Sequence, residues 1–210
     1  MKKLFILTLL ATITFVANAQ NEIVYRTHNP NVGFGKASNC STNEFMDFCV
    51  NGPLVGDNNS PVGGYIDNSN TIQEWVLPES GGGNFAVGNS IFGLDKEGHF
   101  HMCSFEERNT LPEMVWAFQN GPALVQNGKN VRGTSTTKFS RSGIGYDSKG
   151  TLVVIVSLRP VTFYEFADLF VKENCINAIF LDGGPYVGFS DNTKTYGMVS
   201  EAMKLQFFNN

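Results

Sequence analysis

The chain has 210 residues, and its 15 Lys and Arg residues against 19 Asp and Glu residues give a formal net charge of −4 at pH 7. Binding to a phosphate backbone demands clustered Lys and Arg, so this balance argues against a nucleic-acid partner. The length suits one domain, which typically has about 100 to 200 residues.

The first residues have the pattern of a cleavable secretory signal peptide. Lys2 and Lys3 precede an apolar run over 4–16, and small residues stand before an expected cleavage after Ala19. A membrane-spanning helix needs roughly 20 apolar residues, so the run is too short to stay as an anchor. We therefore expect 1–19 to be a signal peptide and 20–210 to be one domain. The protein should be periplasmic or secreted, without stable membrane insertion.

All of the cysteines follow the expected cleavage point: Cys40, Cys49, Cys103 and Cys175. An exported protein can oxidise them, and four cysteines allow three pairings. The spacing does not choose among these pairings. Free buried thiols, which behave as small apolar residues, are the alternative.

Short apolar runs separated by glycine-rich turns predict short strands. The run from Phe45 to Val50 is the first good candidate, because residues 21–44 are polar with scattered glycines. Leu152 to Val156 is continuously apolar, as in a strand buried on both faces, and we place it at the sheet centre. The other expected strands are 64–66, 89–94, 99–103, 115–118, 123–126, 142–146 and 178–181.

One segment has the periodicity of a helix, from Val161 to Glu173. Thr162 is a natural N-cap, and Glu165 three residues later completes a capping box. With the strands on either side, residues 152–181 form a predicted βαβ unit. The expected fold class is therefore α+β, with a mixed, mostly short-stranded sheet, one βαβ unit and few helices.

Several catalytic motifs are absent from the sequence: GxSxG, HExxH, CxxC, the P-loop and GxGxxG. His99 and His101 would share one face of a strand, which permits a metal pair. Because no third ligand is obvious, we favour an exposed strand face there and predict neither a metal nor a cofactor.

Three polar clusters stand beside apolar strands. Asp182 is followed by two glycines at the end of a buried strand, a pattern that also fits a simple hairpin turn. Gln119-Asn120-Gly121 ends another strand. Arg141 enters a third, where it either caps the strand at the surface or holds a phosphate by a two-pronged contact.

Taken together and in order, these clusters resemble the phosphodiester glycosidase domain family, which includes the lysosomal uncovering enzyme, and especially its shorter bacterial branch. The likeness runs from about Phe45 to Phe189. It rests on the stretches Gln119 to Val125, Arg141 to Gly145, Val161 to Ala167 and Ala178 to Gly184, with Val50-Asn51-Gly52 and Pro61-Val62-Gly63 upstream.

The sequence departs from the family pattern in or near the motifs, and Asn51-Gly52-Pro53 replaces a more permissive glycine-rich turn. Asn120 replaces the serine that bacterial relatives commonly carry, and Pro185-Tyr186 occupy the stretch where the family usually has a serine. If that serine holds substrate, this chain has altered specificity or has lost activity.

The resemblance implies an exported hydrolase that cuts a sugar-1-phosphodiester at the anomeric carbon. Such a reaction needs a cation for the phosphate and a carboxylate for the charge developing on the sugar, roles that fall to Arg141 and Asp182. A second carboxylate is not identified. Asp57, Asp67 and Glu165 are candidates, although the capping box explains Glu165 better. The implied substrate-binding residues are Asn51, Gly52, Gln119, Asn120, Gly121, Gly183 and Gly184.

The expected partner is a small molecule or glycan that carries a sugar phosphate. Two alternatives stay open: a non-catalytic carbohydrate or sugar-phosphate binding protein on the same fold, and a metal-dependent phosphodiesterase that uses His99 and His101.

Overall fold

The computed structural model describes residues 21–28, 31–36, 40, 46–56, 60–78, 88–184, 187–193, 195–197 and 203–208. The expected signal peptide, 1–19, lies outside these residues. Among the helices of the described part, none has the length and apolar character needed to cross a bilayer.

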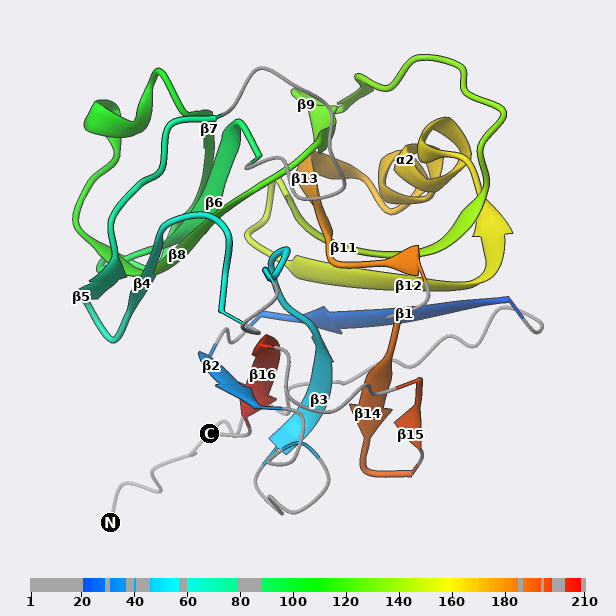
Figure 1. The fold of residues 1–210 in the computed structure, drawn as a ribbon, viewed down its shortest axis with the longest axis horizontal. Coiled ribbons are helices and arrows are strands. Elements are labelled where there is room, and N and C mark those ends of the chain that lie inside the picture. Colours follow the sequence, from blue (N-terminus) through cyan, green and yellow to red (C-terminus); the bar gives the residue numbers. More distant parts are fainter. Residues whose placement is uncertain are drawn as a thin grey trace, which may run out of the picture.

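Three antiparallel sheets make up the fold (Figure 1). The first sheet has the spatial order β1 (Glu22–Thr27), β12 (Leu152–Val161), β11 (Phe139–Asp147), β13 (Cys175–Leu181), β9 (Ala123–Gln126), β10 (Lys129–Asn130). The second has the order β15 (Thr195–Tyr196), β14 (Phe189–Asp191), β3 (Met46–Asn51), β16 (Met203–Phe208), β2 (Val32–Lys36). The third has the order β5 (Asn70–Gln73), β4 (Tyr65–Asp67), β8 (Met114–Asn120), β6 (Ser90–Asp95), β7 (Phe100–Ser104).

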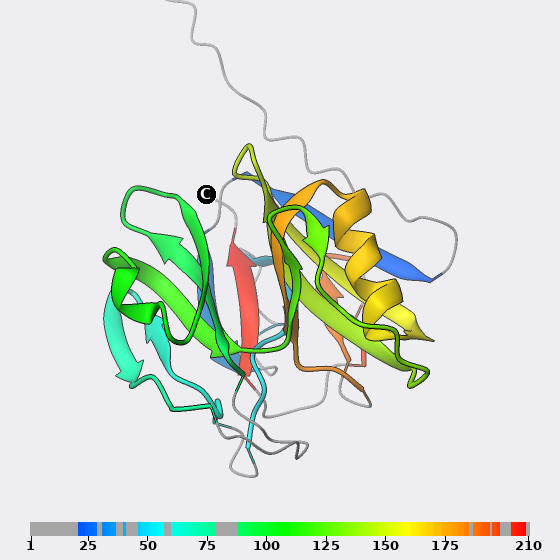
Figure 2. The ribbon, with the colours of Figure 1, turned by 90° about the horizontal axis from the view of Figure 1, so that it is seen from above.

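The main core lies where the three sheets meet, and it is rich in aromatic side chains. Ile144 and Val154 enter it from the first sheet, Phe48 and Phe207 from the second, and Phe118 from the third. In Figure 2, β16 stands between the other two sheets. Because alternate residues of a strand point to opposite faces, Leu205 and Phe207 of β16 face this core, and Lys204 faces away from it.

A second core lies on the other face of the first sheet, under the helix α2 (Phe163–Lys172). Phe166 and Phe170 of α2 are fully buried there, against apolar residues such as Val153 and Ile155 of β12. Both faces of β12 are therefore covered, as its unbroken apolar sequence predicts. In the sheet order, however, β12 lies next to the edge strand β1, and β11 and β13 are central.

The predicted α+β class, with its βαβ unit, is wrong. Strand accounts for 55% of the structure and helix for 10%, so the protein is mainly β. The strands β12 and β13 that flank the helix are not neighbours, because β11 is inserted between them and runs antiparallel to both. Every described strand pair is antiparallel, and no parallel βαβ pairing exists among them.

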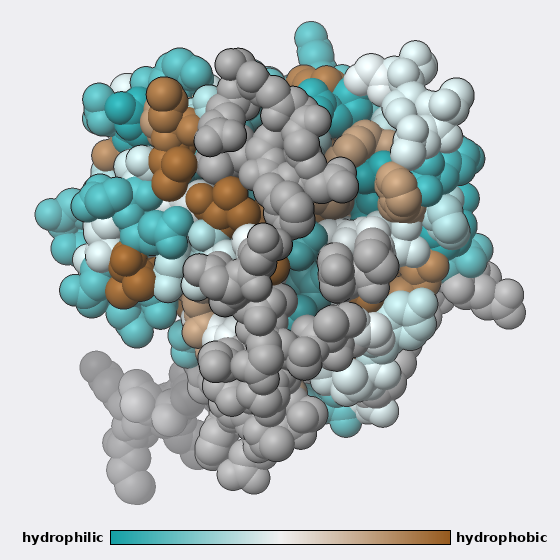
Figure 3. All heavy atoms as spheres, viewed as in Figure 1, coloured by the Kyte–Doolittle hydropathy of each residue, from teal (hydrophilic) through white to brown (hydrophobic). Residues whose placement is uncertain are grey.

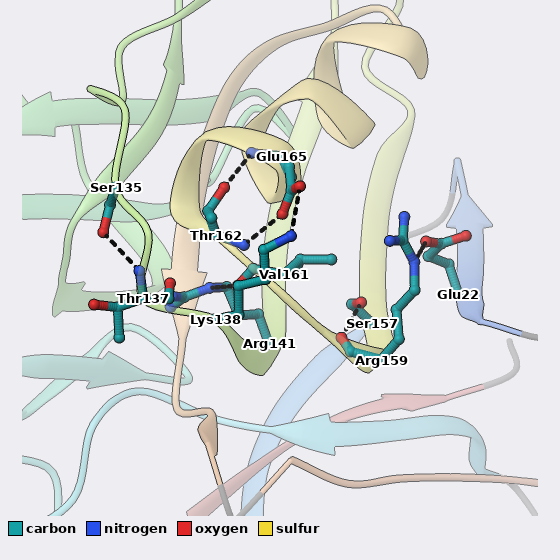
Figure 4. Close-up of polar contacts among 10 residues, drawn as sticks. All are labelled: Glu22, Ser135, Thr137, Lys138, Arg141, Ser157, Arg159, Val161, Thr162 and Glu165. Carbon is teal, nitrogen blue, oxygen red and sulfur yellow. Dashed lines mark hydrogen bonds and ion pairs between the residues drawn. The ribbon is translucent and has the colours of Figure 1, made fainter.

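The capping box predicted for the helix is confirmed (Figure 4). The Thr162 hydroxyl accepts a hydrogen bond from the Glu165 backbone N–H at 3.0 Å, and the Glu165 carboxylate accepts one from the Thr162 N–H at 2.8 Å. The Glu165 carboxylate also forms an ion pair with Lys138 at 3.0 Å. These contacts hold the pKa of Glu165 below its usual value.

Thr162→Ala should lower the free energy of unfolding by about 1 kcal/mol, because it removes an N-cap acceptor. Urea denaturation followed by circular dichroism measures this loss. Thr136→Ala, in an exposed loop, is the matched control and should stay within about 0.5 kcal/mol of wild type. Equal midpoints for the two variants would contradict the assigned role of the cap.

One pair of the cysteines is bonded: Cys40 and Cys49 form a disulfide, whereas Cys103 and Cys175 are free. Large exposed apolar side chains come from separate elements, as Ile72 on β5, Phe139 on β11 and Tyr164 on α2 illustrate. The face seen in Figure 3 agrees, since its brown residues are scattered among hydrophilic ones. Isolated apolar residues of this kind are normal on a protein surface.

Candidate active site at the end of strand β13

The main chain of Asp182 is held firmly where β13 ends. Its N–H donates to the Gly52 carbonyl at 2.9 Å, and its carbonyl accepts from the Ser142 hydroxyl and from the Asn51 amide at 3.3 Å. Asn51 and Ser142 are buried. The contacts join the first sheet to the end of β3 in the second sheet, so they fix the position of Asp182 relative to both.

The carboxylate of Asp182 is half-buried, and one of its oxygens accepts the Gly183 N–H at 2.9 Å. Burial raises the pKa of Asp182 above its usual value, although the Gly183 N–H and the positive charge of Lys204 act in the opposite direction. Gly184 has φ +67°, a left-handed conformation that favours glycine. The chain can therefore turn away sharply after Asp182.

Lys204 of β16 was not among the residues predicted from the sequence. It is 1% exposed, and its amine donates to the Asn51 side-chain oxygen at 2.8 Å. Burial lowers the pKa of Lys204 to about 8, while the negative charge of Asp182 acts to raise it. The only sequence signal for this residue is a lone lysine inside the apolar run Met203–Phe208.

Arg141 stands next to Asp182 in the sheet register, because Ser142 pairs with Leu181. Its side chain lies on the α2 side, where Nε donates to the Val161 carbonyl at 3.0 Å and the guanidinium lies 3.6 Å from the centre of the Phe163 ring (Figure 4). Burial lowers the pKa of Arg141 to about 10. Within the described part of the chain, its guanidinium forms no ion pair with a carboxylate and no hydrogen bond with Asp182.

The side-chain amide of Gln119 holds three loop segments by their main chains. Its oxygen accepts from the N–H groups of Gly64 at 3.2 Å and Val76 at 2.9 Å. Its nitrogen donates to the carbonyls of Val76 at 2.6 Å and Gly88 at 3.0 Å. Gln119 therefore shapes the loops, with its amide already occupied by protein partners.

Asn120 joins β8 to the end of β13. Its amide nitrogen donates to the Phe180 carbonyl at 2.6 Å, and its oxygen accepts from the Leu54 N–H at 3.2 Å. Gly121 follows, and a Cβ atom there would lie 3.0 Å from the Gly88 Cα. The structure thus brings Asn51, Gly52, Asn120 and Asp182 to one end of the first sheet.

Neither of the described candidates for a second carboxylate, Asp67 and Glu165, acts on Asp182. Asp67 ends β4 in the hairpin to β5, and Glu165 caps α2. Asp57 lies outside the described residues, as do Pro185 and Tyr186. His99 and His101 both contact Asp95, at 3.5 Å and 2.7 Å, and the described residues hold no cluster of three or more metal-ligating side chains.

Comparisons with known proteins show which family the chain resembles. Residues 46–198 match the phosphodiester glycosidase family. The uncharacterized protein YigE of Escherichia coli K12 is 29% identical over 145 residues, which are 66% of this chain and 56% of YigE. Human N-acetylglucosamine-1-phosphodiester alpha-N-acetylglucosaminidase is 26% identical over 141 residues, 55% of this chain and 27% of that protein. The chain thus spans only part of either relative.

Solved structures show the same fold. The catalytic domain of the zebrafish N-acetylglucosamine-1-phosphodiester alpha-N-acetylglucosaminidase, auto-inhibited by its pro-peptide, superposes with a TM-score of 0.65 at 16% identity. The superposition covers 95% of this chain and 82% of that one. A hypothetical protein from Synechocystis gives a TM-score of 0.60 at 13% identity, covering 95% of this chain and 61% of that one. Since the family match takes in most of the sequence, this protein belongs to the phosphodiester glycosidase family.

Proposed function

We propose that this protein is an exported glycosidase that hydrolyses a sugar-1-phosphodiester at the anomeric carbon, releasing free sugar and a phosphomonoester. The observation that carries the proposal is Asp182, a half-buried carboxylate whose main chain is fixed by Asn51, Gly52 and Ser142. A carboxylate held rigidly in a partly dehydrated place is suited to stabilise a positively charged transition state. The named activity of the human and zebrafish relatives supports the same reaction class.

In the proposed reaction the bond between the anomeric carbon and the phosphate oxygen breaks, and its electron pair leaves with the phosphate. A phosphomonoester is a good leaving group, because its second ionisation lies near pH 6, so little help from an acid is needed. The oxygen of a water molecule bonds to the anomeric carbon, and one of its protons passes to the surrounding water. Asp182, as the anion, opposes the positive charge that develops on the sugar.

Arg141 is the proposed cation for the phosphate. Its guanidinium has no carboxylate partner in the described part of the chain, so its charge is not already neutralised there. The carbonyls of Val161 and Thr137 and the ring of Phe163 fix its direction. The amides of Gln119 and Asn120 are occupied by main-chain partners, so their proposed part in substrate binding is to shape the loops that border the site.

Hydrolysis in water enriched with ¹⁸O tests the proposal. The substrates are an N-acetylglucosamine-1-phospho-methyl sugar and a panel of UDP-sugars, and the products are free sugar, detected enzymatically, and phosphomonoester, analysed by mass spectrometry. We expect sugar release with no ¹⁸O in the phosphomonoester, because the bond to carbon is cut. Isotope in the phosphate, together with inhibition by a chelator, would instead indicate the metal-dependent phosphodiesterase.

The second candidate is a binding protein for sugar phosphates, which the sequence departure at Pro185 and Tyr186 favours. It predicts no release from any substrate of the panel. It also predicts that calorimetric binding of a sugar phosphate survives in both the wild type and Asp182→Asn.

A further inference from the structure

Lys204 is a buried amine for which the proposed reaction has no assigned role. It lies on β16, outside the family match at 46–198, and only 1% of its surface is exposed. An ammonium group has three N–H donors, yet among the described residues the only hydrogen-bond acceptor for Lys204 is the side-chain oxygen of Asn51. Burying such a group is costly unless it is paired, so its position calls for an explanation.

The partners of Lys204 lead directly to Asp182. Asn51 accepts from the Lys204 amine at 2.8 Å through its oxygen and donates to the Asp182 carbonyl at 3.3 Å through its nitrogen. One amide therefore connects the two residues. The sheet register makes this connection rigid, since Lys204 is the direct cross-strand partner of Asn51 between β16 and β3.

No other described charge competes for this part of the site. On β3, Asp47 acts on the hydroxyl of Tyr25. On β11, Arg141 contacts Val161 and Thr137. Among the described charged groups, Asp182 and Lys204 act on each other alone.

We propose that Lys204 is a positioning residue of the candidate active site, whose ammonium orients Asn51 against the Asp182 main chain and supplies the positive charge that keeps the Asp182 carboxylate ionised. The inference rests on the proposed function for its catalytic consequence, but the coupling between the two side chains does not. Because Lys204 is almost fully enclosed, it acts through Asp182 and Asn51 and has no direct contact with substrate.

Four variants separate the effect of the Lys204 charge from the effect of its hydrogen bond to Asn51. Lys204→Gln removes the charge but keeps a donor for Asn51, and Lys204→Met removes both. Lys204→Arg keeps the charge. Lys172→Met, on the exposed end of α2, changes the net charge by the same amount without touching the site.

The direct measurement is an NMR titration of the Asp182 side-chain carboxyl carbon in ¹³C-labelled protein. The signal is assigned by its absence from the spectrum of Asp182→Asn. We expect the midpoint to move to higher pH in Lys204→Gln and Lys204→Met, and to stay in place in Lys204→Arg and Lys172→Met. An unchanged midpoint in the two neutral variants would overturn the proposal. This readout does not need turnover, so it stands even if no substrate is hydrolysed.

If the wild type releases sugar, the second measurement is kcat/KM for the variants at two pH values. At pH 5 we expect Lys204→Gln to have a kcat/KM about tenfold below wild type, because less of its Asp182 is ionised. At pH 8, where both proteins hold the carboxylate, the difference should shrink to about threefold or less. A loss of equal size at both pH values would show a merely structural role.

If no variant at Lys204 folds, Asp182→Asn provides the reciprocal test. Two groups that influence each other's protonation do so equally, so loss of the Asp182 charge must lower the pKa of Lys204. Burial lowers the pKa of Lys204 to about 8, so its side-chain signal can be followed through that range in labelled wild-type protein. A downward shift of that titration in Asp182→Asn supports the proposal, and an unchanged one refutes it.

Discussion

Replacing Asp182 with Asn should reduce sugar release by about a thousandfold or more, because the variant keeps the shape of the residue and loses the negative charge that opposes the sugar cation. The Asn side-chain oxygen can still accept the Gly183 N–H, and the main-chain bonds to Gly52 and Ser142 do not involve the carboxylate. The kcat of the purified variant on the substrate that the wild type hydrolyses fastest is the measurement.

Asp168→Asn is the matched control for this experiment. Asp168 lies on α2, where its carboxylate accepts from Asn130 at 2.7 Å, a bond that Asn can also make. The control loses the same charge and should keep its activity within about twofold of wild type, as expected for a substitution away from the site. Persistent sugar release by Asp182→Asn would remove Asp182 from the mechanism.

The raised pKa of Asp182 also sets the direction of two pH effects. Activity needs the anion, so the rate should fall as the pH drops through a value above that of an ordinary aspartate. For stability the sign is opposite: an acid whose folded-state pKa is raised contributes stability at low pH, and loses it as the pH rises. Ionised Asp182 therefore costs stability at neutral pH. For this reason Asp182→Asn should not lower the melting temperature at pH 7.

Local sequence patterns were sufficient for nine of the strands and for the helix. Each of the nine expected strands overlaps an observed one, and α2 begins after the predicted cap, Thr162. They missed seven strands: β1, β2, β5, β10, β14, β15 and β16. Of these, β1 and β2 lie in a segment whose sequence is mostly polar. In β1 only Val24 and Tyr25 are buried, so its apolar signal is short. It pairs with β12 along its whole length, from Glu22 with Ser157 to Thr27 with Leu152.

The sequence predicted the positions of strands better than it predicted which strands pair. A strand, a helix and a strand in succession suggest a parallel pair, but nothing in residues 152–181 shows that β11 is inserted between β12 and β13. The insertion is a long-range contact that depends on the glycines of β11. Gly143 and Gly145 leave room for Phe166 and Phe170 of the helix above the sheet.

The candidate site was predicted in part. The order of the motifs indicated that Asn51, Asn120 and Asp182 belong together, and hydrogen bonds through Phe180 and Asp182 do connect them. The sequence did not show that the amides bond to main-chain groups, because such bonds depend on tertiary distances. Nor did it indicate Lys204, which enters from β16 at the far end of the chain.

Gly88→Ala should destabilise the protein by about 3 kcal/mol or more, because no room exists for a side chain at that position. A Cβ atom on Gly88 would lie 1.8 Å from the carbonyl carbon of Asn120 and 2.1 Å from the nitrogen of Gly121. Both neighbours are backbone, which a rotamer change cannot move aside. The main chain between Asn120 and Gly121 would have to shift, and the Gln119 bond to the Gly88 carbonyl would be lost.

The shift should reach the candidate site, since Asn120 holds the Phe180 carbonyl two residues before Asp182. Gly133→Ala is the control: a Cβ atom there meets no atom within 4 Å, so its urea midpoint should match wild type. If Gly88→Ala has the same midpoint as Gly133→Ala, the close approach of Gly88 to Asn120 is wrong. If the folded fraction of Gly88→Ala also releases sugar more slowly, the hydrogen bond from Asn120 to the Phe180 carbonyl sets the position of Asp182. Catalysis then depends on a glycine that does not contact substrate.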